Sequence, residues 1–257
     1  MKTFIKNAKG KNICLLIEKK KNQRGLVFIA HGLGGFKEQK HITAMAKAFQ
    51  KLKYTTIRYD ARNTIGESEG NDKYATITNY YKDLLDVIKW AKQQSFYEEP
   101  FCLVGHSLGS FCVAYYAENH PQKVKYLIPT SAVVSGKLIR ESFSTNALKE
   151  WKQTGWWIRE SHSKPGAIIK LLWRFVEDAQ KYNLLKKVKK LVMPTLLIVG
   201  SKDKITPYKN QKLLYDNLPG EKKLVTIKNG MHTFRKSKSL SELQRVIIEW
   251  VEDNDKS

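Results

Sequence analysis

The feature that most limits the fold is a serine between two glycines, where a strand pattern gives way to a helix pattern. Residues 101–115 read FCLVGHSLGSFCVAY. The continuous apolar run 101–104 is typical of a strand buried on both faces, and the part after residue 110 keeps one apolar helical stripe. Between them, Gly105-His106-Ser107-Leu108-Gly109 matches G-x-S-x-G. In this turn the central residue is strained, and both flanks have to be glycine to avoid a collision.

Such a turn, a nucleophile elbow, presents the serine hydroxyl at the carboxyl edge of a sheet, beside a helix N-terminus. Glycine and serine are also ordinary turn residues, so five residues alone prove little. The interpretation depends on whether a base, an acid and an oxyanion site occur elsewhere in the chain.

The rest of the chain alternates strand and helix patterns. The strand patterns cover residues 2–8, 12–18, 26–30, 54–59, 101–104, 124–128, 191–199 and 223–227. Helix patterns include 76–92, 208–218 and 240–251. The first two strands form a hairpin around Lys9-Gly10-Lys11. This alternation predicts an α/β fold with a mostly parallel eight-stranded sheet, an N-terminal antiparallel hairpin and helices on both faces.

One region, residues 133–186, breaks the alternation. It contains no convincing strand and holds four of the six tryptophans, Trp151, Trp156, Trp157 and Trp173. We interpret it as a helical lid inserted into a core made of residues 1–132 and 187–257, with a short apolar helix at 168–176. An insertion at the carboxyl end of a parallel strand lies over the ligand crevice. The tryptophans then either bind an apolar substrate or pack the lid onto the core.

A serine nucleophile needs a base within hydrogen-bond reach. Among the six histidines, His232 follows the strand pattern 223–227 and is therefore delivered to the same sheet edge as Ser107. The other five lie in turn motifs, helices or the insertion: His31, His41, His106, His120 and His162. We expect the His106 ring to point away from the serine.

The base needs a carboxylate that fixes its tautomer. Asp203 lies in Gly-Ser-Lys-Asp-Lys directly after the strand pattern 191–199. The structural alternative is a turn or helix-capping aspartate, and Asp178, inside the insertion, is a weaker competitor. The order Ser107, Asp203, His232 is the one expected when a sheet with a nucleophile elbow supplies a triad.

An oxyanion site typically uses two backbone N–H groups. Leu108 follows the serine at the helix N-terminus, and Leu33 lies in His31-Gly-Leu-Gly-Gly after the third strand. A dinucleotide turn would require glycine at position 37, where the chain has Lys37, and a phosphate-binding P-loop lacks its Gly-Lys-Ser/Thr.

Composition sets outer limits on function. The chain has 257 residues, a net charge of +22 and no apolar run long enough to span a bilayer. The lysines are dispersed and no nucleic-acid motif is present, so we expect no nucleic-acid partner and attribute the charge to compositional bias. Weak electrostatic association with membranes stays open. Three cysteines (Cys14, Cys102 and Cys112) are expected in the core rather than in a disulfide or metal site. The start lacks a secretory signal, so we expect a cytoplasmic location.

Together these segments resemble the α/β-hydrolase superfamily, in particular cinnamoyl/feruloyl-esterase-like and monoacylglycerol-lipase-like serine hydrolases. The similarity rests on His31-Gly-Leu-Gly-Gly, Gly105-His-Ser-Leu-Gly, the stretches 175–185 and 193–203, and Gly230-Met-His. It implies the triad Ser107, Asp203 and His232, with Leu33 and Leu108 as oxyanion donors. One departure is the loop 60–70, which is one residue longer than the family pattern and has Asn63 where glycine is usual.

We therefore predict a serine hydrolase that cleaves carboxylic esters, with an apolar or aromatic acyl group and no metal or cofactor. The same residues serve thioesters, monoacylglycerols, amides or acyl transfer, because fold and triad do not select the leaving group. A basic rim would favour acyl-CoA or acidic substrates. A non-catalytic binding module on the same fold is the alternative of another class.

Overall fold

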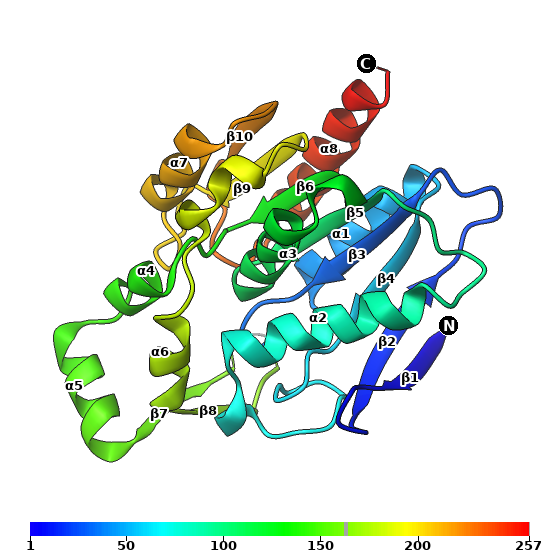
Figure 1. Ribbon diagram of the computed structural model, residues 1–257. Coiled ribbons are helices and arrows are strands. Elements are labelled where there is room, and N and C mark those ends of the chain that lie inside the picture. Colours follow the sequence, from blue (N-terminus) through cyan, green and yellow to red (C-terminus); the bar gives the residue numbers. More distant parts are fainter. Residues whose placement is uncertain (162–163, 257) are drawn as a thin grey trace.

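An eight-stranded sheet forms the centre of the molecule in the computed structural model, which describes residues 1–161 and 164–256. Its strands lie in the order β1-β2-β4-β3-β5-β6-β9-β10 (Figure 1). They are β1 (Lys2–Lys6), β2 (Asn12–Glu18), β3 (Leu26–Ala30), β4 (Thr55–Tyr59), β5 (Phe101–His106), β6 (Val124–Thr130), β9 (Thr195–Gly200) and β10 (Lys222–Ile227). β2 runs antiparallel to β1 and β4, and the other neighbours are parallel. The predicted sheet and its N-terminal hairpin are confirmed.

Helices cover both faces of this sheet. They are α1 (Lys40–Lys51), α2 (Ile77–Ala91), α3 (Leu108–Asn119), α7 (Tyr208–Asn217) and α8 (Ser237–Asn254). α1 and α8 pack against each other on one face, while α2 and α3 pack on the other (Figure 1). Two hydrophobic clusters, one on each side of the sheet, form the core. The described residues also form short 3-10 turns: η1 (Asp72–Tyr74), η2 (Pro121–Lys123), η3 (Leu184–Lys186) and η4 (Val188–Lys190). Within the described ranges, none of the helices combines the length and apolarity needed to cross a membrane.

Register brings the chemically important loops together. In the β3–β5 pair Ala30 faces Gly105, so the loop that follows β3 lies beside the turn that follows β5. In the β9–β10 pair Ile227 faces Gly200, so the loops after these two strands are also neighbours. All four loops leave the carboxyl ends of parallel strands, where α/β sheets bind ligands.

The insertion is not purely helical, and the prediction of no strand between residues 133 and 186 is wrong. It contains α4 (Gly136–Glu141), α5 (Thr145–Thr154), the antiparallel pair β7 (Trp156–Glu160) and β8 (Ile168–Leu172), and α6 (Arg174–Ala179). The predicted helix at 168–176 is a strand followed by a helix. Exposed and less exposed residues alternate along β7 and β8, which is the period of a strand with one covered face.

The strand expected at 191–199 begins later than predicted. Residues 188–190 form the 3-10 turn η4, and the ladder starts at Thr195, directly after Pro194. Proline has no N–H to donate to a ladder, so the strand begins only once this residue has been passed.

Candidate active site

Ser107 lies at the tip of a strained turn between β5 and α3. Its backbone has φ 53° and ψ −116°, a conformation that non-glycine residues rarely adopt. A Cβ on Gly105 would lie 2.6 Å from the backbone of Gly109 and Ser110, and a Cβ on Gly109 would lie 2.4 Å from the Ala30 carbonyl oxygen. Both flanking positions therefore require glycine, for the steric reason that the motif suggested.

The structure brings Ser107, His232 and Asp203 together. His232 Nε2 lies 3.1 Å from Ser107 Oγ, and His232 Nδ1 lies 2.9 Å from Asp203 Oδ2. The carboxylate accepts a hydrogen bond from Nδ1–H, which leaves Nε2 as the acceptor of a hydrogen bond from the serine hydroxyl. The loops that carry Asp203 and His232 approach each other closely, since a Cβ on Gly200 would lie 2.2 Å from the Gly230 carbonyl oxygen.

Hydrogen bonds hold Asp203 in its ionised form. Oδ1 accepts from the backbone N–H groups of Ile205 (2.9 Å) and Thr206 (3.0 Å), and Oδ2 accepts from Thr206 Oγ1 (2.9 Å). Burial raises the pKa of this carboxyl, but the hydrogen bond and charge of His232 and the Thr206 N–H outweigh it, so that the pKa falls to about 2. Asp203 is thus a fixed negative charge beside the imidazole.

His106 contacts His232, which the sequence did not reveal. Its ring lies 4.8 Å from the His232 ring, and its Nε2 donates to the His232 carbonyl oxygen at 2.7 Å. Burial, followed by the charge of His232, lowers the pKa of His106 to about 3, so the ring is neutral. The ring of His41 packs against the His106 ring, with centroids 4.2 Å apart. The available sequence signal was the position of His106, directly before the serine in the elbow motif.

The other candidates from the sequence lie elsewhere. Asp178 accepts from the backbone N–H and the hydroxyl of Thr78, at the start of α2. His120 packs against the Tyr116 ring at 4.6 Å. His162 lies outside the described residues.

The loop 31–37 lies directly against Ser107. A Cβ on Gly32 would lie 2.9 Å from Ser107 Cβ. His31 fixes the start of this loop, because its Nδ1 lies 2.8 Å from the Gly32 carbonyl oxygen and its Nε2 accepts from the Ala61 N–H at 2.9 Å. Leu33 follows in this loop, and Leu108 begins α3 beside the serine. Both predicted oxyanion donors therefore belong to segments that adjoin Ser107.

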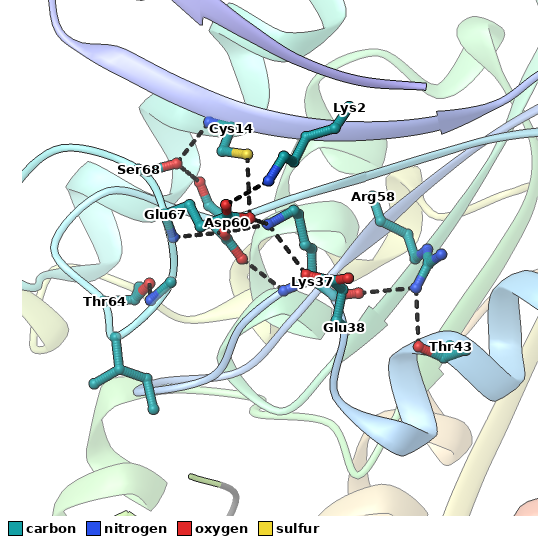
Figure 2. Close-up of polar contacts among 12 residues, drawn as sticks. Lys2, Cys14, Lys37, Glu38, Thr43, Arg58, Asp60, Thr64, Glu67 and Ser68 are labelled. Atoms are coloured by element: carbon teal, nitrogen blue, oxygen red, sulfur yellow. Dashed lines mark hydrogen bonds and ion pairs between the residues drawn. The ribbon is translucent and has the colours of Figure 1, made fainter. Parts of the chain in front are cut away.

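A buried ion cluster fixes the other end of this loop. Lys37 is 2% exposed, and its Nζ contacts Asp60 Oδ2 at 2.9 Å and the Glu67 carboxylate (Figure 2). The Lys37 N–H also donates to Asp60 Oδ1 at 2.6 Å. Burial lowers the pKa of Lys37, but the hydrogen bonds to Glu67 and Asp60 outweigh it, and the lysine stays charged. Cys14, Asp60 and Glu67 form a group with metal-ligand spacing among the described residues, yet Lys37 already supplies the cation there.

The loop 60–70 accommodates its departure from the family pattern. Asn63 has φ 61°, the left-handed region that glycine would occupy and that asparagine tolerates best among other residues. Its Oδ1 accepts from the Asn71 N–H at 3.1 Å, so the side chain also closes the loop.

Two of the tryptophans have clear surroundings. Trp151 is 1% exposed and is surrounded by the rings of Phe143, Trp157, Trp173 and Phe175, at 5.4 to 6.3 Å between centroids. Trp151 is therefore the centre of an aromatic cluster within the insertion, and this packing explains why the residue is a tryptophan without a substrate contact. Trp156 is 39% exposed and lies on the outer face of β7. Trp157 and Trp173 are half-buried, and a substrate contact stays a prediction for them.

Comparison with known proteins agrees with this architecture. Residues 25–150 match the family described as alpha/beta hydrolase fold, and residues 156–237 match the one described as Serine aminopeptidase, S33. The chain belongs to the α/β-hydrolase superfamily. The predicted family and fold class are therefore confirmed.

Named relatives are distant in sequence. Palmitoyl-protein thioesterase ABHD10, mitochondrial, is 26% identical in Mus musculus over 76% of this chain and 24% identical in Bos taurus over 89%. The matched regions span 63% and 73% of those proteins. Est1E from Butyrivibrio proteoclasticus with bound ferulic acid superimposes with a TM-score of 0.83 at 21% identity, covering 99% of this chain and 100% of Est1E. The mouse ABHD10 structure gives 0.80 at 23% identity, covering 98% and 99%. The comparisons support a serine hydrolase of this fold.

Proposed function

We propose that the protein is a carboxylic ester hydrolase that works through an acyl-enzyme on Ser107. The observation that carries the proposal is the position of His232. Its two ring nitrogens lie within hydrogen-bond distance of Ser107 and Asp203, although the three residues follow three different strands. Nucleophile, base and orienting acid in this geometry form the arrangement that activates a serine.

In the proposed reaction, Ser107 Oγ attacks the acyl carbonyl carbon while His232 Nε2 takes the hydroxyl proton. Asp203 keeps the ring in the required tautomer and stabilises the imidazolium that forms. The imidazolium then protonates the departing alcohol, and the acyl group stays on Ser107. A water molecule, deprotonated by His232, attacks the acyl-enzyme and releases the acid.

The tetrahedral oxyanion would be bound by the backbone N–H groups of Leu33 and Leu108. The close approach of Gly32 to Ser107 supports this role for the loop 31–37. Such donors stabilise charge that develops only in the transition state, and losing one typically reduces kcat by about 10²–10³-fold. No step of this scheme uses a metal or an organic cofactor.

A thioester is the second candidate substrate. The similarity to ABHD10, named a palmitoyl-protein thioesterase, supports it, and the ferulic acid bound to Est1E supports an ester with an aromatic acyl group. To separate ester from thioester hydrolysis, kcat/KM is compared for esters and thioesters that carry the same acyl group. Repeating the comparison with butyryl, octanoyl, palmitoyl and feruloyl groups defines the preferred acyl chain length.

The proposal predicts that Ser107→Ala is inactive. Loss of the serine from a comparable triad reduces kcat by about a million-fold, so turnover of p-nitrophenyl butyrate should fall to the background rate. Ser241→Ala, an exposed serine on α8, is the matched control and should keep wild-type turnover. Circular dichroism checks that both variants are folded. Ordinary turnover by folded Ser107→Ala would contradict the mechanism, and an inactive wild type would favour a binding module.

A further inference from the structure

Arg159 lies against the loop that carries Leu33. It stands on β7, where it faces Ile169 of β8 across the hairpin. A Cβ on Gly34 would lie 2.4 Å from Ile169 Cδ1 and 3.5 Å from Arg159 Nη2. The inner face of the hairpin β7–β8 therefore rests on the loop 31–37, two residues from the glycine that touches Ser107.

Arg159 lacks a counter-ion among the residues that the structure describes. In the described part of the chain no carboxylate forms an ion pair with it. Its Nη1 donates to the Glu160 carbonyl oxygen at 3.2 Å, and its guanidinium lies over the Trp157 ring at 5.2 Å. The Glu160 carboxylate accepts from the Gly166 N–H instead. Burial lowers the pKa of Arg159, yet a guanidinium stays protonated in proteins. A half-buried charge without a counter-ion is costly, which points to an anionic ligand.

A second arginine lies on the loop that carries His232. Arg235 follows His232 by three residues and is exposed, with its Nε donating to Thr233 Oγ1 at 2.8 Å. Burial lowers the pKa of Arg159 most, and the positive charge of Arg235 lowers it further. Arg235 therefore adds positive charge on the loop that carries His232.

We propose that Arg159, assisted by Arg235, binds an anionic group of the substrate, a carboxylate or a phosphate. Guanidinium matches both groups because its N–H donors form a planar fork. This inference rests on the proposed ester hydrolysis and narrows its substrate class: the ester or thioester carries an anionic group that reaches Arg159 when its acyl carbon lies at Ser107 Oγ.

The test compares substrates with and without an anionic group. The carboxylate arm sets mono-p-nitrophenyl succinate against neutral p-nitrophenyl pentanoate. The phosphate arm sets butyryl-CoA against butyryl-N-acetylcysteamine, which lacks the nucleotide that carries the phosphates. Each pair is measured with the wild type, Arg159→Gln, Arg159→Lys and Lys170→Gln. Lys170→Gln is the matched control, because Lys170 lies on the outer face of the same hairpin and its substitution removes the same positive charge.

We expect the wild type to prefer the charged member of at least one pair. Arg159→Gln should lower kcat/KM for that member about 10- to 100-fold, the range for a hydrogen bond to a charged group, mainly through KM. Its turnover of the neutral member should stay within about threefold. Arg159→Lys should recover part of the loss, and Lys170→Gln should match the wild type. The pair that responds identifies the group as carboxylate or phosphate.

Two results would overturn the inference: no preference for either charged member, or an equal loss on charged and neutral members in Arg159→Gln. If the wild type hydrolyses none of the four, the proposed function fails instead. Calorimetric titration of Ser107→Ala with monobutyl succinate and with CoA then tests the anion-binding subsite by itself. Binding that becomes weaker when Arg159→Gln is added supports the subsite, and the absence of binding refutes it.

Discussion

Asp203 carries a full negative charge at any pH at which the protein is expected to work. Its carboxylate accepts four hydrogen bonds, which hold its pKa near 2 in spite of burial. Loss of activity on acidification above pH 4 therefore has to come from another group. The Asp203 pKa is lower in the folded protein than its ordinary value of 3.8, so its contribution to stability is present above about pH 4 and is lost as the pH falls toward 2.

The variant Asp203→Asn tests this role. Asparagine keeps the shape but donates where the carboxylate accepts, which favours the wrong His232 tautomer, and in a comparable triad this reduces kcat about 10⁴-fold. We expect the same order of loss for p-nitrophenyl butyrate at pH 7. In urea titrations, the stability advantage of the wild type over the variant should shrink between pH 4 and pH 2. A variant with near-wild-type kcat would assign Asp203 the capping role that the sequence also allowed.

Among the elements, the loop 31–37 depends on anchors at both ends. His31 ties its start to Ala61, two residues after β4, and Lys37 ties its end to Asp60 and Glu67 (Figure 2). The glycines between these anchors supply no side-chain contacts of their own. The ion cluster therefore positions the segment that carries the Leu33 N–H.

Lys37→Met is expected to weaken both the fold and the reaction. Removing one partner from a buried pair costs about 3–5 kcal/mol, because it leaves an uncompensated charge, here on Asp60. The free energy of unfolding in urea should fall by that order, and kcat should fall more than KM rises. Lys137→Met removes an 84% exposed lysine and should change stability by less than about 0.5 kcal/mol. Equal stability of the two variants would show that the cluster does not anchor the loop.

The elements differ in how far the sequence predicts them. The helix at 76–92 was predictable because its apolar stripe and the capping residue Thr76 agree. The hairpin β7–β8 was not, because its strands have only five residues each and their flanks are helical. Apolar runs this short fit a helix or a strand equally well. The pairing of β7 with β8 and their packing against η1 and the loop 31–37 decide between them.

At the scale of the molecule, the parallel sheet is what made the site predictable. Residues that follow parallel strands meet at one edge, so Ser107, Asp203 and His232 could be grouped from their positions after strand patterns. The contacts of His106 and Arg159 could not be predicted from the sequence, since they depend on how loops and the insertion fold over that edge. The net charge of +22 acts on every anionic ligand through the overall field. The comparison of Arg159→Gln with Lys170→Gln separates that field from a specific contact, because both substitutions remove one positive charge.

The most direct measurement of the central claim is the site and rate of labelling by a fluorophosphonate probe, mapped by peptide mass spectrometry. The account predicts a single adduct on Ser107 in the folded wild type. It also predicts labelling at least about 10²-fold slower in His232→Ala, since a positioned base contributes about 10²–10⁴-fold. An adduct on another serine, no adduct at all, or equal rates in the two proteins would contradict it.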